Sequence, residues 1–171
     1  MRIFLLGCTG FIGSELIPKL LDQDHTVIVV GRKILKGFEQ ARKSNKLIYF
    51  QIDPSNVNSW KNLDFLKALE ESDAVVNLVG EPIAEKRWTK EHCKLIENSR
   101  LDTTRLLVEA MSRIRRPPKV LVNASAIGFY GTSLKEKFDE TSSQGNDFLA
   151  ELCAKWEKIA ISKPRNTRLV I

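Results

Sequence analysis

The chain has 171 residues, of which 43% are hydrophobic and 28% are charged, and its formal net charge is +6. This length and composition exclude a disordered chain and predict one folded domain over residues 1–171. No apolar run reaches the roughly 18 residues of a membrane span, and the basic residues are scattered without interleaved aromatics, so we expect neither a membrane nor a nucleic-acid partner.

The cysteines indicate the compartment. Cys8, Cys93 and Cys153 form no Cys-x-x-Cys pair, and their number is odd. This argues against a disulfide framework and a zinc site, so we expect no metal and a cytoplasmic location. The first apolar residues stop at Gly7 without a small-residue cleavage site, which favours a buried strand over a signal peptide.

Apolar residues alternate along the chain between strand-like and helix-like spacing. The pattern predicts strands at residues 2–6, 25–30, 47–52, 74–79, 120–124 and 168–171, and helices at 11–22, 60–70, 89–114 and 147–161. Residues 31–46 and 125–146 are predicted loops, so one crossover helix is weak or missing. This alternation predicts an α/β fold, a Rossmann-like doubly wound parallel sheet with helices on both faces. Because the chain stops at the opening of a strand, we expect it to be truncated before a substrate lobe.

A glycine-rich loop links the first predicted strand to the first predicted helix. It reads Gly7-Cys8-Thr9-Gly10-Phe11-Ile12-Gly13. In this context the first glycine permits a tight turn, the second lets the backbone approach a pyrophosphate, and the third lets the helix pack against the strand. The helix N-terminus adds free amides and a partial positive charge. We therefore predict that a nicotinamide dinucleotide is bound by Gly7, Thr9, Gly10, Phe11, Ile12 and Gly13, with Thr9 also capping locally and Cys8 filling space.

The residues at the ends of the second and third predicted strands indicate whether NAD or NADP binds. NAD-binding chains carry Asp or Glu about 20 residues after the glycine loop, where this chain reads Val30-Gly31-Arg32-Lys33. Arginine pairs with a 2′-phosphate through its planar fork, so we favour NADP over NAD. The alternative is a solvated Arg32. Asp53 ends the third strand, and two readings stay open: contact with the adenine, or capping of a turn.

Longer motifs are similar to those of a known family. They are Asn77-Leu78-Val79-Gly80-Glu81-Pro82-Ile83, Arg87-Trp88-Thr89, Ser99-Arg100, Ser125-Ala126-Ile127-Gly128-Phe129-Tyr130-Gly131 and Asp147-Phe148-Leu149-Ala150-Glu151-Leu152-Cys153. With the glycine loop, they make the chain resemble the "epimerase family protein" subgroup of the atypical short-chain dehydrogenases/reductases. The resemblance covers essentially all 171 residues.

The resemblance implies a fold, a cofactor and further site residues. It implies an NADP-dependent oxidoreductase or a nucleotide-sugar epimerase of about 300 residues, of which this chain is the N-terminal part. In such proteins Leu78, Val79 and Gly80 would pass under the adenosine and ribose, and Arg100 would face the cofactor. From the residues alone, Arg100 is a mid-helix arginine that is either solvated or partnered.

The catalytic pattern of the wider superfamily is incomplete in this chain. Its enzymes use Ser, Tyr and Lys, with Tyr-x-x-x-Lys on the helix after the fifth strand. Neither Tyr49 nor Tyr130 is followed by Lys four residues later. Ser125 and Tyr130 are therefore weak catalytic candidates, and a gapless register to Tyr130 puts Ala126 at the serine position.

The helix expected to carry the tyrosine and lysine has other residues in their places. Depending on register, the tyrosine position holds Leu149 or Cys153 and the lysine position holds Cys153 or Glu157. Three functions follow, in order of preference. The first is an NADP-binding oxidoreductase or epimerase acting on an unknown small carbonyl or alcohol substrate. The second is a non-catalytic dinucleotide-binding regulator or scaffold, with a cell-division type of role. The third is a nucleic-acid or partner-binding module that uses the basic charge.

Overall fold

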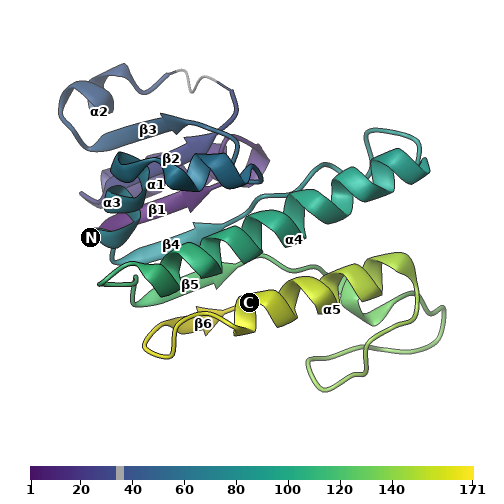
Figure 1. Ribbon diagram of the computed structural model, residues 1–171. Helices are drawn as coiled ribbons and strands as arrows, with labels where there is room; N and C mark the ends of the chain where they lie inside the picture. Colours follow the sequence, from purple (N-terminus) through teal and green to yellow (C-terminus); the bar gives the residue numbers. More distant parts are fainter. Residues whose placement is uncertain (34–36) are drawn as a thin grey trace.

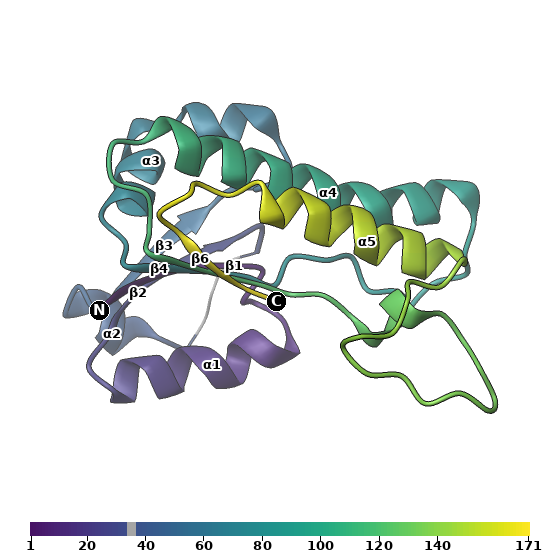
Figure 2. The ribbon, with the colours of Figure 1, turned by 90° about the horizontal axis from the view of Figure 1, so that it is seen from below.

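The computed structural model describes residues 1–33 and 37–171 as a sheet covered by helices on both faces (Figures 1 and 2). Six parallel strands stand in the order β3-β2-β1-β4-β5-β6. They are β1 (Arg2–Leu6), β2 (Thr26–Gly31), β3 (Leu47–Gln51), β4 (Ala74–Asn77), β5 (Val120–Asn123) and β6 (Arg168–Val170). This order confirms the predicted doubly wound fold class, and its switch point lies between β1 and β4.

The helices divide between the two faces of the sheet. On one face lie α1 (Phe11–Asp22) and α2 (Glu39–Lys43), and on the other lie α3 (Leu63–Glu70), α4 (Lys90–Arg113) and α5 (Phe148–Ile161), as Figure 2 shows. Two 3₁₀ helices, η1 (Val57–Lys61) and η2 (Ile127–Tyr130), lie in the connections. None of the helices in the described part of the chain, α4 included, combines the length and apolarity needed to cross a membrane.

The central strands supply two cores because successive side chains point to opposite faces. Phe4 and Leu6 of β1 pack into the core under α3 and α4, whereas Ile3 and Leu5 pack against α1. β2 divides in the same way. Burial on both faces explains why these strands read as continuous apolar runs in the sequence.

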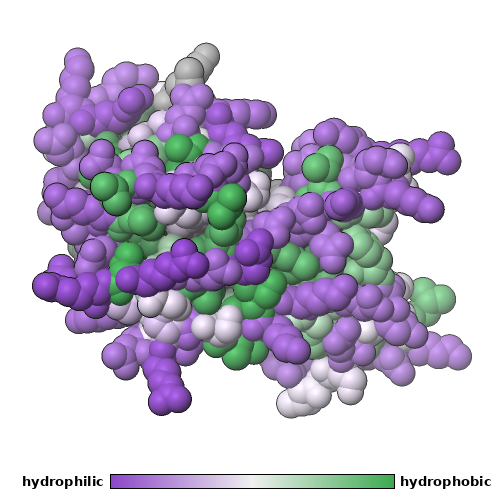
Figure 3. Space-filling model, in the orientation of Figure 1, coloured by the Kyte–Doolittle hydropathy of each residue, from purple (hydrophilic) through white to green (hydrophobic). Residues whose placement is uncertain are grey.

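The two long helices on the α4–α5 face begin at polar caps. Thr89 Oγ1 accepts from His92 N at 3.2 Å at the start of α4, and Asp147 Oδ1 accepts from Ala150 N at 2.9 Å at the start of α5. The N-terminal part of α4 projects beyond the carboxyl ends of the strands, with α5 beside it (Figure 1). In the space-filling view the molecule is notched between this projecting part and the β2–β3 side (Figure 3).

Three predicted segments differ from the structure. The predicted loop over residues 125–146 contains η2. The predicted loop over residues 31–46 contains α2, so the weak crossover has a short helix after all. The predicted helix at 60–70 is wrong as a single element, since η1 ends at Lys61 and α3 begins at Leu63. The break follows from Asn62, whose side chain accepts from Phe65 N at 3.0 Å and caps α3. Asparagine competes for backbone hydrogen bonds in this way and favours helix starts.

Candidate functional site

The glycine loop leaves β1 by a turn that tolerates no side chain at its first glycine. Gly7 has φ +74°, and a Cβ there would lie 2.5 Å from Val79 N and 2.6 Å from the Leu78 carbonyl carbon. A Cβ on Gly13 would lie 2.0 Å from the Cys8 carbonyl oxygen. The tight turn and the close helix packing that the sequence predicted are therefore both present, and Leu78 and Val79 lie against the loop.

The N-terminus of α1 is open where an anion would approach. Gly10 is its N-cap and supplies no side-chain cap. The nearest atom to a Cβ built on Gly10 is the Gly7 carbonyl oxygen, at 4.0 Å, and the Phe11 side chain is 90% exposed. Free amides and the helix dipole at an uncovered N-terminus make an anion site, so the loop fits a pyrophosphate.

Thr9 and Cys8 fill space beside this N-terminus. The predicted local cap by Thr9 is wrong for α1, because the N-cap position falls on Gly10. The methyl carbon of Thr9 instead lies 2.8 Å from where a Cβ on Gly31 would be, at the end of β2. Cys8 is buried, and burial raises the pKa of its thiol to about 12, in keeping with the packing role expected for it.

Arg32 and Asp53 follow β2 and β3 at the same edge of the sheet. The Arg32 side chain is 66% exposed, and its Nη2 lies 3.8 Å from Glu81 Oε2. Asp53 Oδ1 accepts from Ser55 N at 2.9 Å and from Ser55 Oγ at 2.7 Å. Of the two readings for Asp53, the capped turn is therefore present in the structure, and contact with adenine stays a prediction.

A buried network that sequence reasoning missed holds the end of β4. Asn77 Nδ2 donates to Thr104 Oγ1 at 2.9 Å and to Asn123 Oδ1 at 2.8 Å, and Asn77 Oδ1 accepts from Val79 N at 3.3 Å. Trp156 Nε1 donates to the same Thr104 hydroxyl at 2.8 Å. These bonds tie β4, β5, α4 and α5 together and orient the backbone of Leu78–Gly80. The sequence signal was an asparagine ending two adjacent apolar strands.

Arg100 of α4 is partnered and only partly solvated. Its Nη1 donates to the carbonyls of Glu81 and Ile96, both at 3.1 Å, and its guanidinium carbon lies 5.5 Å from the centre of the Trp156 ring. Burial lowers the pKa of the Arg100 guanidinium. A Cβ on Gly80 would lie 2.8 Å from the guanidinium carbon. Arg100 thus packs against Gly80, so it is partnered and not simply solvated, and its contact with the cofactor stays a prediction.

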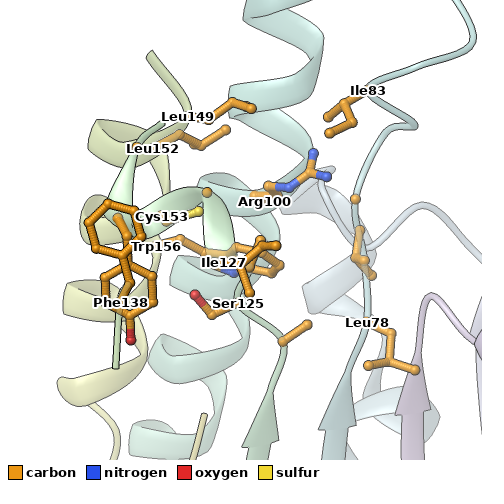
Figure 4. Close-up of a pocket in the computed structure, with 17 residues that line it drawn as sticks. Leu78, Ile83, Arg100, Ser125, Ile127, Phe138, Leu149, Leu152, Cys153 and Trp156 are labelled. Atoms are coloured by element: carbon orange, nitrogen blue, oxygen red, sulfur yellow. The ribbon is translucent and has the colours of Figure 1, made fainter. Parts of the chain in front are cut away.

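A cavity of about 750 Å³ opens at the carboxyl ends of β4 and β5, between α4 and α5 (Figure 4). We call it the α4–α5 cavity. Its walls are mostly apolar, and its polar groups include Arg100, Ser125 and Tyr130. It is lined by Leu78, Val79, Gly80, Ile83, Arg100, Ala124, Ser125, Ala126, Ile127, Gly128, Tyr130, Gly131, Phe138, Leu149, Leu152, Cys153 and Trp156. The cavity therefore joins residues predicted to bind the cofactor with both weak catalytic candidates.

Ser125 meets the helix positions that carry tyrosine and lysine in the wider superfamily. Its hydroxyl donates to a Glu157 carboxylate oxygen, and Cys153 lies in the cavity wall beside it. Burial, followed by the charge of Glu157, raises the pKa of the Cys153 thiol. Tyr130 stacks on Phe138 with ring centres 5.6 Å apart. Ser125 is thus joined to a carboxylate, in a cavity wall where Cys153 and not a tyrosine lies beside it.

Outside this cavity we looked for clusters of titratable side chains that could bind a metal ion. Within residues 1–33 and 37–171, no three His, Cys, Asp or Glu side chains are grouped so that they could hold a metal ion. His92 is buried on α4, and neither of its ring nitrogens has a hydrogen-bond partner among the described residues.

Comparison with known proteins confirms the family resemblance and the fold. The model of the NAD dependent epimerase/dehydratase family matches residues 3–152. The epimerase family protein SDR39U1 homolog of Arabidopsis thaliana, a chloroplastic protein, is 36% identical over 173 residues, which cover 100% of this chain and 47% of that protein. Human epimerase family protein SDR39U1 is 34% identical over 174 residues, covering 100% of this chain and 53% of the relative.

Solved structures agree. A crystal structure of human SDR39U1 (isoform 2) with NADPH has a TM-score of 0.77 at 32% identity, over 99% of this chain and 52% of that one. MoeE5 in complex with UDP-glucose and NAD has a TM-score of 0.74 at 19% identity, over 99% and 52%, a likeness that shows the fold alone. The chain spans about half the length of the relatives that it matches. With 150 consecutive residues, 3–152, matched by the family model, this chain belongs to the NAD dependent epimerase/dehydratase family.

Proposed function

We propose that this chain binds NADP(H) at the carboxyl edge of its sheet and serves as the cofactor-binding part of an oxidoreductase or epimerase acting on a small carbonyl or alcohol substrate. The observation that carries the proposal is the uncapped N-terminus of α1 above the Gly7 turn, beside the switch point of the sheet. Ligands of open α/β sheets bind in this crevice. The crystal structure of human SDR39U1 with NADPH supports the same cofactor class.

The described residues suggest how the cofactor would be held. The amides of the glycine loop would take the pyrophosphate, and Arg32 would take the 2′-phosphate that distinguishes NADP from NAD. The segment Leu78–Gly80, held by Asn77 and packed against Gly7, would lie under the sugar and lead toward the α4–α5 cavity.

A bound nicotinamide supplies hydride transfer, and residues of this chain must then accept the proton of the substrate hydroxyl or return it to the substrate oxygen. Ser125 faces the cavity and is hydrogen-bonded to Glu157, so its hydroxyl can accept a proton from a substrate oxygen while Glu157 takes the proton that Ser125 releases. The apolar walls would limit water at the reacting carbon. In this arrangement Ser125 is the catalytic residue and Glu157 is the group that holds the proton.

A second function is favoured by one specific observation. Cys153, with a raised thiol pKa, lies beside Ser125, and no tyrosine followed by lysine occurs on α5. A chain that binds the dinucleotide without turning it over, as a regulator or scaffold, would need no acid/base pair.

The first experiment is calorimetric titration with NADPH and with NADH at one fixed salt concentration. We expect NADPH to bind about 10- to 100-fold more tightly, the range for a charge-assisted bond to the 2′-phosphate. Binding of neither dinucleotide would overturn the proposal.

The second experiment separates the two functions. NADPH consumption is followed with a panel of small carbonyl compounds, using Ser125→Ala as the matched variant. NADPH binding with consumption that Ser125→Ala abolishes supports the enzyme. Binding that is equal in both proteins, without consumption of NADPH by either, supports the regulator.

A further inference from the structure

One ion pair crosses the crevice in which the dinucleotide is proposed to bind. Strands β2 and β4 both pair with β1, on opposite sides (Figure 1). Adjacent strands are spaced by about 4.8 Å, so the ends of β2 and β4 are about 10 Å apart. Arg32 directly follows β2 and Glu81 lies beyond the end of β4, yet Arg32 Nη2 and Glu81 Oε2 are 3.8 Å apart. The pair therefore spans the carboxyl end of β1, where the glycine loop begins.

The two residues of this ion pair differ in burial and in the hydrogen bonds that fix their backbone. Glu81 N donates to Ser99 Oγ at 2.9 Å, and the Glu81 carbonyl accepts from Arg100 at 3.1 Å, so α4 fixes its backbone. The Glu81 side chain is 18% exposed, against 66% for Arg32. Glu81 is therefore the more buried partner with an anchored backbone, and Arg32 is the more exposed partner.

A second cation also meets the Glu81 carboxylate. Lys86 Nζ lies 3.4 Å from Glu81 Oε1. Glu81 therefore does not depend on Arg32 for its only counter-charge, and it keeps a partner when the guanidinium leaves.

We propose that Glu81 is a specificity-determining residue that competes with the 2′-phosphate of NADP(H) for Arg32. This inference rests on the proposed function. An ion pair at 3.8 Å with one largely exposed partner is weak, whereas a phosphate with a charge of about −2 offers the planar guanidinium two charged acceptors. NADP(H) binding must therefore break the pair, while NAD(H), which lacks the phosphate, leaves it in place. Glu81 lowers the selectivity that Arg32 alone would give.

The test is calorimetric titration of NADPH and NADH into the wild-type chain, Glu81→Gln and Glu85→Gln. Glu85 is an exposed residue in the same connection, and its substitution removes the same charge without touching the ion pair. We expect Glu81→Gln to bind NADPH about 3- to 10-fold more tightly, because a competing charge is removed close to the phosphate. NADH affinity should change less than about twofold, as should both affinities in Glu85→Gln.

A double variant shows whether the gain passes through Arg32. In the Arg32→Ala background, Glu81→Gln should no longer tighten NADPH binding, since the two residues act on one another. Weaker NADPH binding by Glu81→Gln would mean that Glu81 positions Arg32, and an equal gain for NADPH and NADH would mean a general charge effect; either overturns the inference. So does unchanged NADPH affinity.

The outcomes also separate this inference from the proposed function. If the wild-type chain binds neither dinucleotide, the proposed function fails. If NADPH binds and Arg32→Ala weakens it while Glu81→Gln changes nothing, the function stands and the competition does not exist.

Discussion

At the glycine-loop end of the crevice, the groups that face a ligand are backbone amides, whereas at the α4–α5 cavity they are side chains. The loop depends on the absence of side chains, since a Cβ on Gly7 or Gly13 would overlap neighbouring backbone. The cavity depends on which side chains are present, and there Ser125 meets Glu157 in place of the Tyr–Lys pair. Within one crevice, the loop has the backbone geometry that the glycine fingerprint requires, while the Tyr–Lys part of the superfamily's acid/base pattern is absent.

Cofactor binding and turnover place different demands on the residues of this fold. Amides at a helix N-terminus offer their hydrogen bonds whatever the surrounding side chains are. Proton transfer requires a particular group with a suitable pKa at the reacting atom.

The largest effect is expected from Gly10→Asp. A carboxylate at this position would repel the pyrophosphate, so we expect NADPH affinity to fall at least about 100-fold, equal to about 2.7 kcal/mol, by calorimetry. Gly10→Ala controls for folding, because a Cβ here has no neighbour closer than 4.0 Å and the fold should be unaffected, while the added methyl group occupies part of the space proposed for the pyrophosphate and should weaken NADPH binding less than the carboxylate does. Unchanged NADPH affinity in Gly10→Asp would remove the loop from the binding site.

Arg32→Glu should weaken NADPH binding about 10- to 100-fold, and NADH binding much less, because the charge-assisted bond to the 2′-phosphate is lost. The matched control is Lys33→Glu, which reverses the same charge at the next exposed residue. Equal losses in the two variants would mean that the positive charge of the region, and not Arg32 itself, selects NADP.

The framework of the cavity is tested by Trp156→Phe. The indole N–H that donates to Thr104 is lost, and a smaller ring leaves space in the core. We expect the free energy of unfolding, from urea denaturation, to fall by about 2 kcal/mol. NADPH affinity should fall less than about threefold if the glycine loop dominates binding. A large loss of NADPH affinity with little change in the free energy of unfolding would mean that the α4–α5 cavity, and not the glycine loop, dominates NADPH binding.

The smallest effect is expected for Cys8, whose buried side chain belongs to the glycine loop. Burial raises the pKa of its thiol from 9.0 to about 12. Above pH 9 the thiol ionises in the unfolded chain but stays protonated in the folded one, so the unfolded state binds fewer protons and stability falls as pH rises toward 12. At pH 10 this loss is about 1.4 kcal/mol. Urea denaturation at pH 8 and pH 10 should show a steeper decline for the wild type than for Cys8→Ala, and parallel declines would contradict the assignment.

The strands along the chain, the doubly wound fold class and the glycine loop were predictable because their signals are local. Buried parallel strands leave continuous apolar runs such as 26–30, and a loop of glycines between a strand and a helix has few structural meanings. The errors were local too. Asn62 interrupts a run that reads as one helix, and α2 lies in a polar stretch without an apolar face.

The candidate site was only partly predictable. Asp53, Arg32 and Arg100 were chosen by position, but the sequence could not say that Asp53 closes a turn on Ser55 or that Arg100 packs on Trp156. Glu81 and Glu157 entered no predicted site. Their importance comes from partners in distant segments, which periodicity does not reveal.

The amino-acid sequence by itself determined the doubly wound fold class, because strand and helix patterns alternate along it, and the turn at Gly7 and the uncapped start of α1, because these depend on residues within one strand–loop–helix unit. The tertiary structure alone decided that Arg32 meets Glu81, that Ser125 donates to Glu157, and that Asn77 joins β4 to β5. Such contacts join groups from separate strands and helices, and their distances are set by how the elements pack, not by the spacing of residues along the chain.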